Sequence, residues 1–411
     1  MKVLMFGWEF PPFNKGGLGV ACYGLTKGLS NKGVSTIFVI PKAPKSAKGE
    51  HVKLIVASNI KNVTIREVGS PMVAYMAPDE YNERVRNLLL YGKSKGDSDI
   101  YGSDLFQEVE RYALRARKIA LNEDFDVIHA HDWMTYKAGI EAKKATGKPL
   151  VVHIHATEFD RTGGNGVNQY VYDIEKEGFE AADVICAVSN FTKNKLVEHY
   201  GINPGKIHVV HNAVEFTNFD EHVPKIADNE KVVLFLGRIT LQKGPDYFVE
   251  AAKKVLEKDP NVKFIVAGSG DMLPKMIEMV AERGLSRKML FAGFLRGKDI
   301  DRAYKMADLY VMPSVSEPFG ITPLEAMRNG TPVLISKQSG VSEVIQNCLK
   351  VDFWDIDEMA NKILAVLKYA PLHTCLKEEG CREVLKFNWD EPAQKCIDAY
   401  NKAIQTNNGG R

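Results

Sequence analysis

The stretch Ser-Glu-Pro-Phe-Gly-Ile-Thr-Pro-Leu-Glu at residues 316–325 governs the interpretation of the whole chain. It follows an apolar run at 309–313, which predicts a short buried strand. Thr322 at the N-cap, Pro323 at the first helical position and Glu325 three residues after the cap predict a helix. A strand, a loop with a flexible glycine and a helix N-terminus with unpaired N–H groups form a phosphate site. The loop is therefore predicted to hold a diphosphate.

Two carboxylates, Glu317 and Glu325, lie eight positions apart across this loop. Because like charges repel, neither is expected to contact the phosphate, and both are predicted to bind hydroxyls. A carboxylate accepts hydrogen bonds from two vicinal hydroxyls at once, as on a ribose or a hexose. The structural alternatives are a capping-box glutamate at Glu325 and a solvated loop acid at Glu317.

The length of 411 residues exceeds what one hydrophobic core normally supports, so two domains are expected. The 54 basic and 52 acidic residues nearly cancel, which argues against a nucleic-acid or membrane-surface partner. A sparse basic run at Lys42, Lys45, Lys48 and Lys53 is interpreted as a solvated loop. No apolar run approaches the ~18 residues of a membrane span, and the first residues lack a signal-peptide pattern.

The six cysteines show no paired spacing of the metal-binding type, and several lie in apolar or helical contexts. They are interpreted as reduced structural thiols of a cytoplasmic protein. A disulfide between Cys375 and Cys381 is the alternative in an oxidising compartment. The cysteines are Cys22, Cys186, Cys348, Cys375, Cys381 and Cys396.

The start of the chain has the pattern of an open parallel sheet. A strand at residues 2–6, a glycine-rich turn at 16–19, a helix to about Leu29 and a strand at 35–40 follow one another. The glycines would let the backbone approach a ligand, and tight helix packing explains them equally well.

Further along, polar residues at 78–104 are interpreted as a surface excursion that could close over a site. Strands at 127–130 and 150–155 then end in polar residues, among them Asp132 and His155. Open α/β sheets bind ligands at the carboxyl ends of their strands, so both side chains are candidates for sugar contacts. The alternative for His155, whose strand is largely apolar, is a satisfied core histidine.

The second half restarts the same pattern after a polar stretch at 212–230, which we interpret as an interdomain linker. A strand at 232–236 leads into a loop that holds Arg238 and Lys243, at the same sheet edge as Glu317. An Arg fork and a Lys point charge together neutralise a diphosphate and stabilise it as a leaving group. Taken alone, such a pair would be surface residues.

The combined pattern resembles the retaining glycosyltransferases of the GT-B fold, over essentially the whole chain. The motifs that resemble the donor-binding half are Gly237-Arg238, Lys243-Gly244, Gly268-Ser-Gly-Asp271 and residues 316–325. The motifs that resemble the glycogen and starch synthase branch (GT4/GT5-like) are Trp8-Glu-Phe-Pro-Pro12, Gly16-Gly-Leu-Gly19, His131-Asp-Trp133 and the strand that ends in His155.

The resemblance implies an α/β protein of two facing Rossmann-like, doubly wound domains with a cleft between them. Residues 1–212 would be the acceptor-side domain and residues 213–385 the nucleotide-sugar donor domain. The helix expected after Trp389, within 386–411, would cross back onto the first domain.

The resemblance also implies roles for individual residues. Arg238 and Lys243 would hold the diphosphate, Glu325 the ribose hydroxyls, and Glu317 and His155 would lie beside the reacting sugar. The remaining implied donor contacts are Asp132 near sugar hydroxyls and the backbone amides of Gly17, Phe319, Gly320, Ile321 and Thr322 at the phosphates.

One departure concerns the Lys-x-Gly-Gly-Leu motif of plant and enteric synthases, since Asn14 occupies the lysine position here and Lys15 the next. Either Lys15 substitutes, or the diphosphate is held without that lysine. The departure bears on the choice of donor and acceptor more than on the reaction class.

The expected reaction moves glucose from UDP-glucose or ADP-glucose to the non-reducing end of an α-1,4-glucan, with anomeric retention. No Asp-x-Asp motif is placed to bind a metal at the diphosphate, so no metal or cofactor is expected. The alternatives are a small-sugar acceptor of the trehalose type, an envelope or lipid-linked glycan acceptor, a nucleotide-sugar epimerase and a non-catalytic sensor. The sequence leaves the oligomeric state open.

Overall fold

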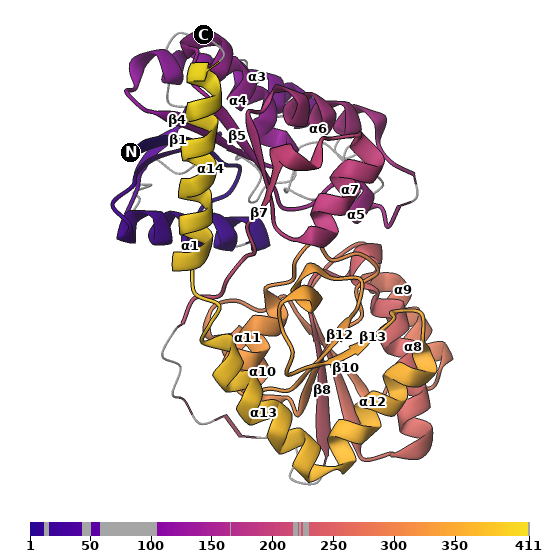
Figure 1. Ribbon diagram of the computed structural model, residues 1–411. Coiled ribbons are helices and arrows are strands. Elements are labelled where there is room, and N and C mark those ends of the chain that lie inside the picture. Colours follow the sequence, from indigo (N-terminus) through magenta and orange to yellow (C-terminus); the bar gives the residue numbers. More distant parts are fainter. Residues whose placement is uncertain are drawn as a thin grey trace.

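The computed structural model describes residues 1–11, 16–42, 51–57, 105–164, 166–216, 221, 223–224 and 230–409. These residues form two α/β domains, each built on a parallel sheet, with one domain above the other in Figure 1. The expected excursion at 78–104, the residues Asn14, Lys15, Lys45 and Lys48, and much of the linker at 212–230 lie outside the described residues.

The first sheet has seven strands in the order β3-β2-β1-β4-β5-β6-β7, and its strand pairs are parallel. Apolar runs suit these strands because helices cover both faces of the sheet. The strands are β1 Lys2–Phe6, β2 Ser35–Ile40, β3 Lys53–Val56, β4 Val127–His131, β5 Leu150–Ile154, β6 Val184–Ala187 and β7 Ile207–Val209. The helices are α1 Gly17–Asn31, α3 Leu105–Asn122, α4 Trp133–Thr146, α5 Glu158–Arg161, α6 Gln169–Ala181, α7 Asn190–Tyr200 and the 3₁₀ turn η2 Pro204–Lys206.

The second sheet has six strands in the order β10-β9-β8-β11-β12-β13, again in parallel pairs. This is the strand order of a doubly wound nucleotide-binding sheet, which confirms the expected fold class. The strands are β8 Lys231–Leu236, β9 Val262–Ala267, β10 Met289–Gly293, β11 Leu309–Met312, β12 Val333–Ser336 and β13 Leu349–Val351. The helices are η3 Leu241–Lys243, α8 Pro245–Lys258, α9 Leu273–Glu282, α10 Lys298–Met306, α11 Thr322–Arg328, η4 Gly340–Glu343, α12 Ile356–Lys368 and α13 Ala370–Val384.

Each sheet has an apolar core on both faces. In β1, Leu4 and Phe6 pack into one core of the first domain, and Val3 and Met5 pack into the other. This division follows from the two-residue period of a strand, which turns successive side chains to opposite faces. The two faces of the second sheet are covered in the same way.

The last helix, α14 Asp390–Gly409, packs against α1 on the first domain and crosses it in the view of Figure 1. It buries Ala393, Cys396 and Tyr400 in the same core as Val3 and Met5. Two glycines of α1 permit this approach: a Cβ at Gly24 would lie 2.1 Å from the Trp389 ring. A Cβ at Gly28 would lie 2.4 Å from the Trp389 carbonyl oxygen. The predicted return of the C-terminal helix is therefore present.

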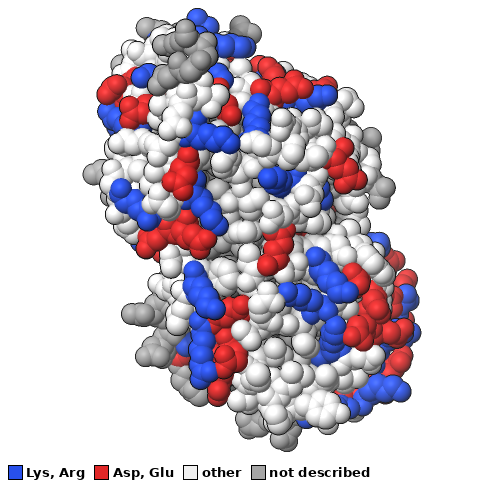
Figure 2. Space-filling model, viewed as in Figure 1, with Lys and Arg blue, Asp and Glu red and all other residues white. Residues whose placement is uncertain are grey.

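The six cysteines are free, and Cys375 is exposed. Among the helices that the structure describes, none combines the length and apolar content that a membrane span requires. Basic and acidic side chains are interspersed over both domains on the face in Figure 2, in keeping with the formal charge of +2.

Candidate active site

The strand ends of the two domains are joined by a set of polar contacts between loops. Asp160, in α5 of the first domain, accepts hydrogen bonds of 2.6 Å from Ser316 Oγ and from Lys195 Nζ. Burial alone would raise the pKa of Asp160, but Lys195 and the hydroxyls of Ser316 and Thr157 lower it. Ser189, the N-cap of α7, donates from Oγ to the Pro318 carbonyl at 2.5 Å. The stretch at 316–325 therefore lies against the first domain.

The loop before α11 is fixed by backbone hydrogen bonds to a neighbouring loop. Glu317 N–H donates to the Gln338 carbonyl at 2.9 Å, and Val341 N–H donates to the Phe319 carbonyl at 2.8 Å. Gly320 has φ +99°, and a Cβ there would lie 3.1 Å from Glu317 Cγ. Both the dihedral angle and the close approach favour glycine, as the sequence predicted for this loop.

One prediction about this stretch is wrong. α11 begins at Thr322, the N-cap residue is Ile321, and no side chain caps the helix. Thr322 Oγ1 instead accepts a 2.9 Å hydrogen bond from the Tyr310 hydroxyl, so the capping box does not form. Glu325 is left to accept a hydrogen bond of 3.2 Å from the Tyr304 hydroxyl. Burial is the main influence on the pKa of Glu325, and it raises that pKa.

Lys243 and Glu317 form an ion pair between Nζ and Oε2. Glu317 is only 6% exposed and also accepts from Ser314 Oγ at 3.2 Å, so it is not a solvated loop acid. Lys243 is positioned by η3 and by Gly244, which has φ +61°. A Cβ at Gly244 would lie 2.2 Å from the Pro313 carbonyl oxygen, which explains the glycine. The sequence placed both charges at this edge but did not predict their pairing.

Arg238 lies after β8 and donates from Nη2 to Gln242 Oε1 at 3.0 Å. It is partly buried, and its charge acts on Glu9 of the first domain. Gln242 is itself only 3% exposed, so the hydrogen bond from Arg238 to this buried side chain fixes the position of the guanidinium on the loop.

Asp132 and His155 form a tight corner at the ends of β4 and β5. His155 N–H donates to Asp132 Oδ1 at 2.6 Å, and Asp132 N–H donates to the His153 carbonyl at 2.9 Å. Asp132 has φ +58° and ψ 167°, and it is the single non-glycine with positive φ within the described ranges. A non-glycine residue held at such dihedral angles costs on the order of 1–3 kcal/mol of stability. Residues of this kind are concentrated at functional sites.

The ring of His155 is partly buried, and its Nε2 lies 3.0 Å from His131 Nδ1. Burial lowers the pKa of His155, and the charge of Asp132 raises it in part. The net effect favours the neutral imidazole at pH 7. His131 and His153 are fully buried, whereas His155 is only partly buried.

The other predicted donor contacts are backbone groups. A Cβ at Gly17, in the first turn of α1, would meet none of the described residues within 4 Å. Open space of this kind leaves room for a ligand beside the helix N-terminus. On the other domain, Phe319 is 2% exposed, while Ile321 and Thr322 are partly buried at the start of α11.

Two family models match the chain. One, described as Glycosyltransferase Family 4, covers residues 15–217, and the other, Glycosyl transferases group 1, covers residues 217–382. An uncharacterized glycosyltransferase of Methanocaldococcus jannaschii is 30% identical over 98% of this chain and 99% of its own length.

The chain belongs to the glycosyltransferases of the GT-B fold.

This glycosyltransferase is also similar to a protein named glycogen synthase from Mycobacterium tuberculosis. The two are 24% identical, over 84% of this chain and 80% of the relative. Among solved structures, sucrose-phosphate synthase from Thermosynechococcus elongatus superposes with a TM-score of 0.75 at 18% identity, covering 98% of this chain and 99% of that one. At that identity the likeness shows the fold alone.

Glu9 is a further candidate site residue, which the sequence alone did not single out. It is 6% exposed, and the backbone amides of Gly19 and Gly16 at the start of α1 act on its carboxylate. Burial raises the pKa of Glu9 to about 7, against the lowering effects of those amides and of Arg238. Its Oε2 atom has no hydrogen-bond partner among the described residues. The available signal was an acid three residues after an apolar strand, within the Trp8–Pro12 motif.

Proposed function

We propose that the enzyme is a retaining glucosyltransferase that extends an α-1,4-glucan at its non-reducing end, as a glycogen synthase does. The donor is UDP-glucose or ADP-glucose, and no metal or resident cofactor takes part. The observation that carries the proposal is the Lys243–Glu317 ion pair, with both side chains largely buried, at an edge that contacts the first domain.

The donor diphosphate requires positive charge and directed N–H groups. Arg238 and Lys243 supply two cations from one loop, and the N-terminus of α11 lacks a side-chain cap. An uncapped helix start leaves amides free for phosphate oxygens, and its dipole favours negative charge. Glu325, in the first turn of α11, then accepts from ribose hydroxyls.

The transferred glucose would contact Glu317, Asp132 and His155. When Lys243 turns to the phosphate, the Glu317 carboxylate becomes available to sugar hydroxyls. The neutral His155 ring can donate to or accept from a hydroxyl without adding charge. In the transfer, the bond between C1 and the phosphate oxygen breaks, and a bond between C1 and the acceptor oxygen forms on the same face. The acceptor proton goes to the departing diphosphate.

Several features support the glucan acceptor and the compartment. The similarity to a protein named glycogen synthase extends over 84% of this chain, and the Trp8–Pro12 and Gly16–Gly19 motifs resemble those of the same branch. The six free cysteines favour a reducing compartment, so we assign the enzyme to the cytoplasm.

The test measures nucleotide release from UDP- and ADP-sugars, with and without glycogen, together with product chain length and anomeric configuration. Release that depends on glycogen, with α-linked chain extension, supports the proposal and names the donor. Release only with a small sugar or sugar phosphate would replace the polymer by a small acceptor. Product of inverted configuration would contradict the retaining mechanism.

A further inference from the structure

Four histidines stack beneath α1 and α14 in the first domain. His129 and His131 alternate on β4, while His153 and His155 alternate at the end of β5. The parallel register pairs His131 with His153, so all four rings lie on one face of the sheet. Ring centroids are 4.3 Å apart for His129 and His131, and 4.5 Å apart for His153 and His155.

These rings carry nitrogen atoms without hydrogen-bond partners. Nε2 of His131, Nε2 of His129 and both ring nitrogens of His153 are buried and unpartnered in the part of the chain that the structure describes. His131 Nδ1 and His155 Nε2 are an exception, because they lie 3.0 Å apart and share a hydrogen bond. An imidazole nitrogen is the commonest metal ligand that a protein side chain offers.

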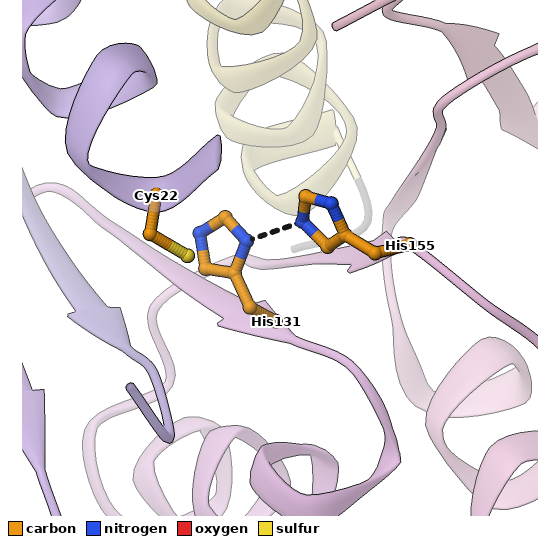
Figure 3. Close-up of side chains that lie close together, drawn as sticks. All are labelled: Cys22, His131 and His155. Atoms are coloured by element: carbon orange, nitrogen blue, oxygen red, sulfur yellow. Dashed lines mark hydrogen bonds between the residues drawn. The ribbon is translucent and has the colours of Figure 1, made fainter. Parts of the chain in front are cut away.

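A thiol completes the arrangement. Cys22 extends from α1, is fully buried and lies beside the His131 ring, on which His155 also converges (Figure 3). One ligand atom from each of Cys22, His131 and His155 falls within 4.8 Å of the others. The carboxyl groups of Asp132 and Glu9 lie near the Cys22 thiol.

We propose that Cys22, His131 and His155 bind one soft divalent metal ion of the zinc class. Sulfur and imidazole ligands suit zinc and disfavour magnesium or calcium, which prefer oxygen. Binding breaks the S–H bond of Cys22 and releases its proton to solvent, and the thiolate joins two neutral imidazoles. The Asp132 carboxyl group lies close enough to offset the remaining positive charge.

The two histidines require only a small adjustment to share an ion. In a tetrahedral site with Zn–N bonds of about 2.0–2.1 Å, ligand nitrogens lie about 3.3 Å apart. His131 Nδ1 and His155 Nε2 are 3.0 Å apart and share a hydrogen bond, which the ion would replace. Two neighbouring groups, His129 with His131 and His153, and His153 with Cys186 and Cys396, are entirely buried. His155 is accessible, so an ion can enter at this group.

The proposed ion inhibits the enzyme, and this part rests on the proposed function. His155 is the histidine assigned to the donor sugar, and coordination would hold its ring against His131. Metal-independent transfer and zinc binding thus compete for one side chain. Zinc binding itself does not depend on the identity of donor or acceptor.

The experiment uses the full chain with Cys375, an exposed thiol outside the cluster, replaced by alanine to remove background metal binding. Zinc affinity is measured by competition with a chromophoric chelator, and Co²⁺ is added as a spectroscopic probe. We expect one tight site and an intense thiolate-to-cobalt band. Cys22→Ala should abolish the band and weaken zinc binding by at least about 100-fold. Circular dichroism checks that the variant folds.

The outcomes separate the two proposals. Absence of a stoichiometric site, or a site that Cys22→Ala leaves unchanged, overturns the metal assignment. If Cys22→Ala does not fold, the cobalt spectrum of the Cys375→Ala protein decides instead. An octahedral spectrum without a thiolate band overturns the metal assignment. Zinc that binds at Cys22 without slowing turnover overturns the inhibitory role alone. Failure to find turnover with any nucleotide sugar refutes the proposed function and leaves the binding result intact.

Discussion

Lys243 Nζ contacts Glu317 Oε2 where the side chain of Glu317 is 8% exposed and that of Lys243 is 21% exposed. Removal of one partner leaves the other charge largely buried and uncompensated, which is the costly case for an ion pair. The pair therefore links the stability of the loop to the predicted function of both residues.

Lys243→Ala is expected to reduce kcat/KM for nucleotide sugar by at least about 100-fold, since a diphosphate leaving group loses a cation. It should also lower the free energy of unfolding by about 2 kcal/mol, less than for fully buried pairs because Lys243 retains some exposure. Urea unfolding and steady-state kinetics measure the two effects. The double variant Lys243→Ala/Glu317→Gln should regain stability without regaining activity. Recovery of both would show that the pair is only structural.

Glu325→Ala is expected to weaken binding of the nucleoside diphosphate by about 10- to 100-fold, because two ribose hydroxyls lose a charged acceptor. Isothermal titration with UDP and ADP measures this. Tyr304→Phe is the matched control, since it removes only the 3.2 Å hydrogen bond from the Tyr304 hydroxyl to Glu325. Equal losses in both variants would indicate that Glu325 acts through Tyr304 rather than on the ligand.

The fold was predictable because its determinants are local. Apolar runs of four to six residues marked the buried strands, for example β8 and β11, and the repeated strand–helix alternation implied parallel sheets. For the candidate site, the sheet edge at which each residue lies was predictable. His155, Lys243 and Glu317 all follow strand ends, where ligands bind in this class of sheet.

The features that the sequence did not predict are contacts between segments that are distant in sequence. Thr322 was expected to cap α11, but the Tyr310 hydroxyl, twelve residues earlier on β11, donates to it instead. The Lys243–Glu317 pair joins residues 74 positions apart, and no local pattern indicates it. Glu9 was missed because its unusual pKa comes from burial against α1, which only the folded chain creates.

Glu9 should make the stability of the protein depend on pH. Its folded-state pKa of about 7 lies above the ordinary value of 4.5, so the folded protein binds the extra proton between these values. Stability is therefore expected to fall as pH rises from 4.5 to 7, by up to about 3 kcal/mol for this group. Glu9→Gln should remove this contribution, as measured by urea unfolding across the range. An unchanged pH dependence would mean that Glu9 is already ionised at pH 5.

The contact between α1 and Trp389 gives a test of the returning helix. Gly28→Ala would place a Cβ 2.4 Å from the Trp389 carbonyl oxygen, and backbone cannot yield as a flexible side chain can. In an exposed helix, alanine is more stabilising than glycine by up to ~1 kcal/mol. The sign of the change in stability therefore shows whether helix propensity or packing against Trp389 dominates at this position. We expect a net loss of about 1–3 kcal/mol. Ser30→Ala, at an exposed position of the same helix, is the control and should be neutral or slightly stabilising. A Gly28→Ala protein as stable as the control would show that α14 does not lie this close to α1.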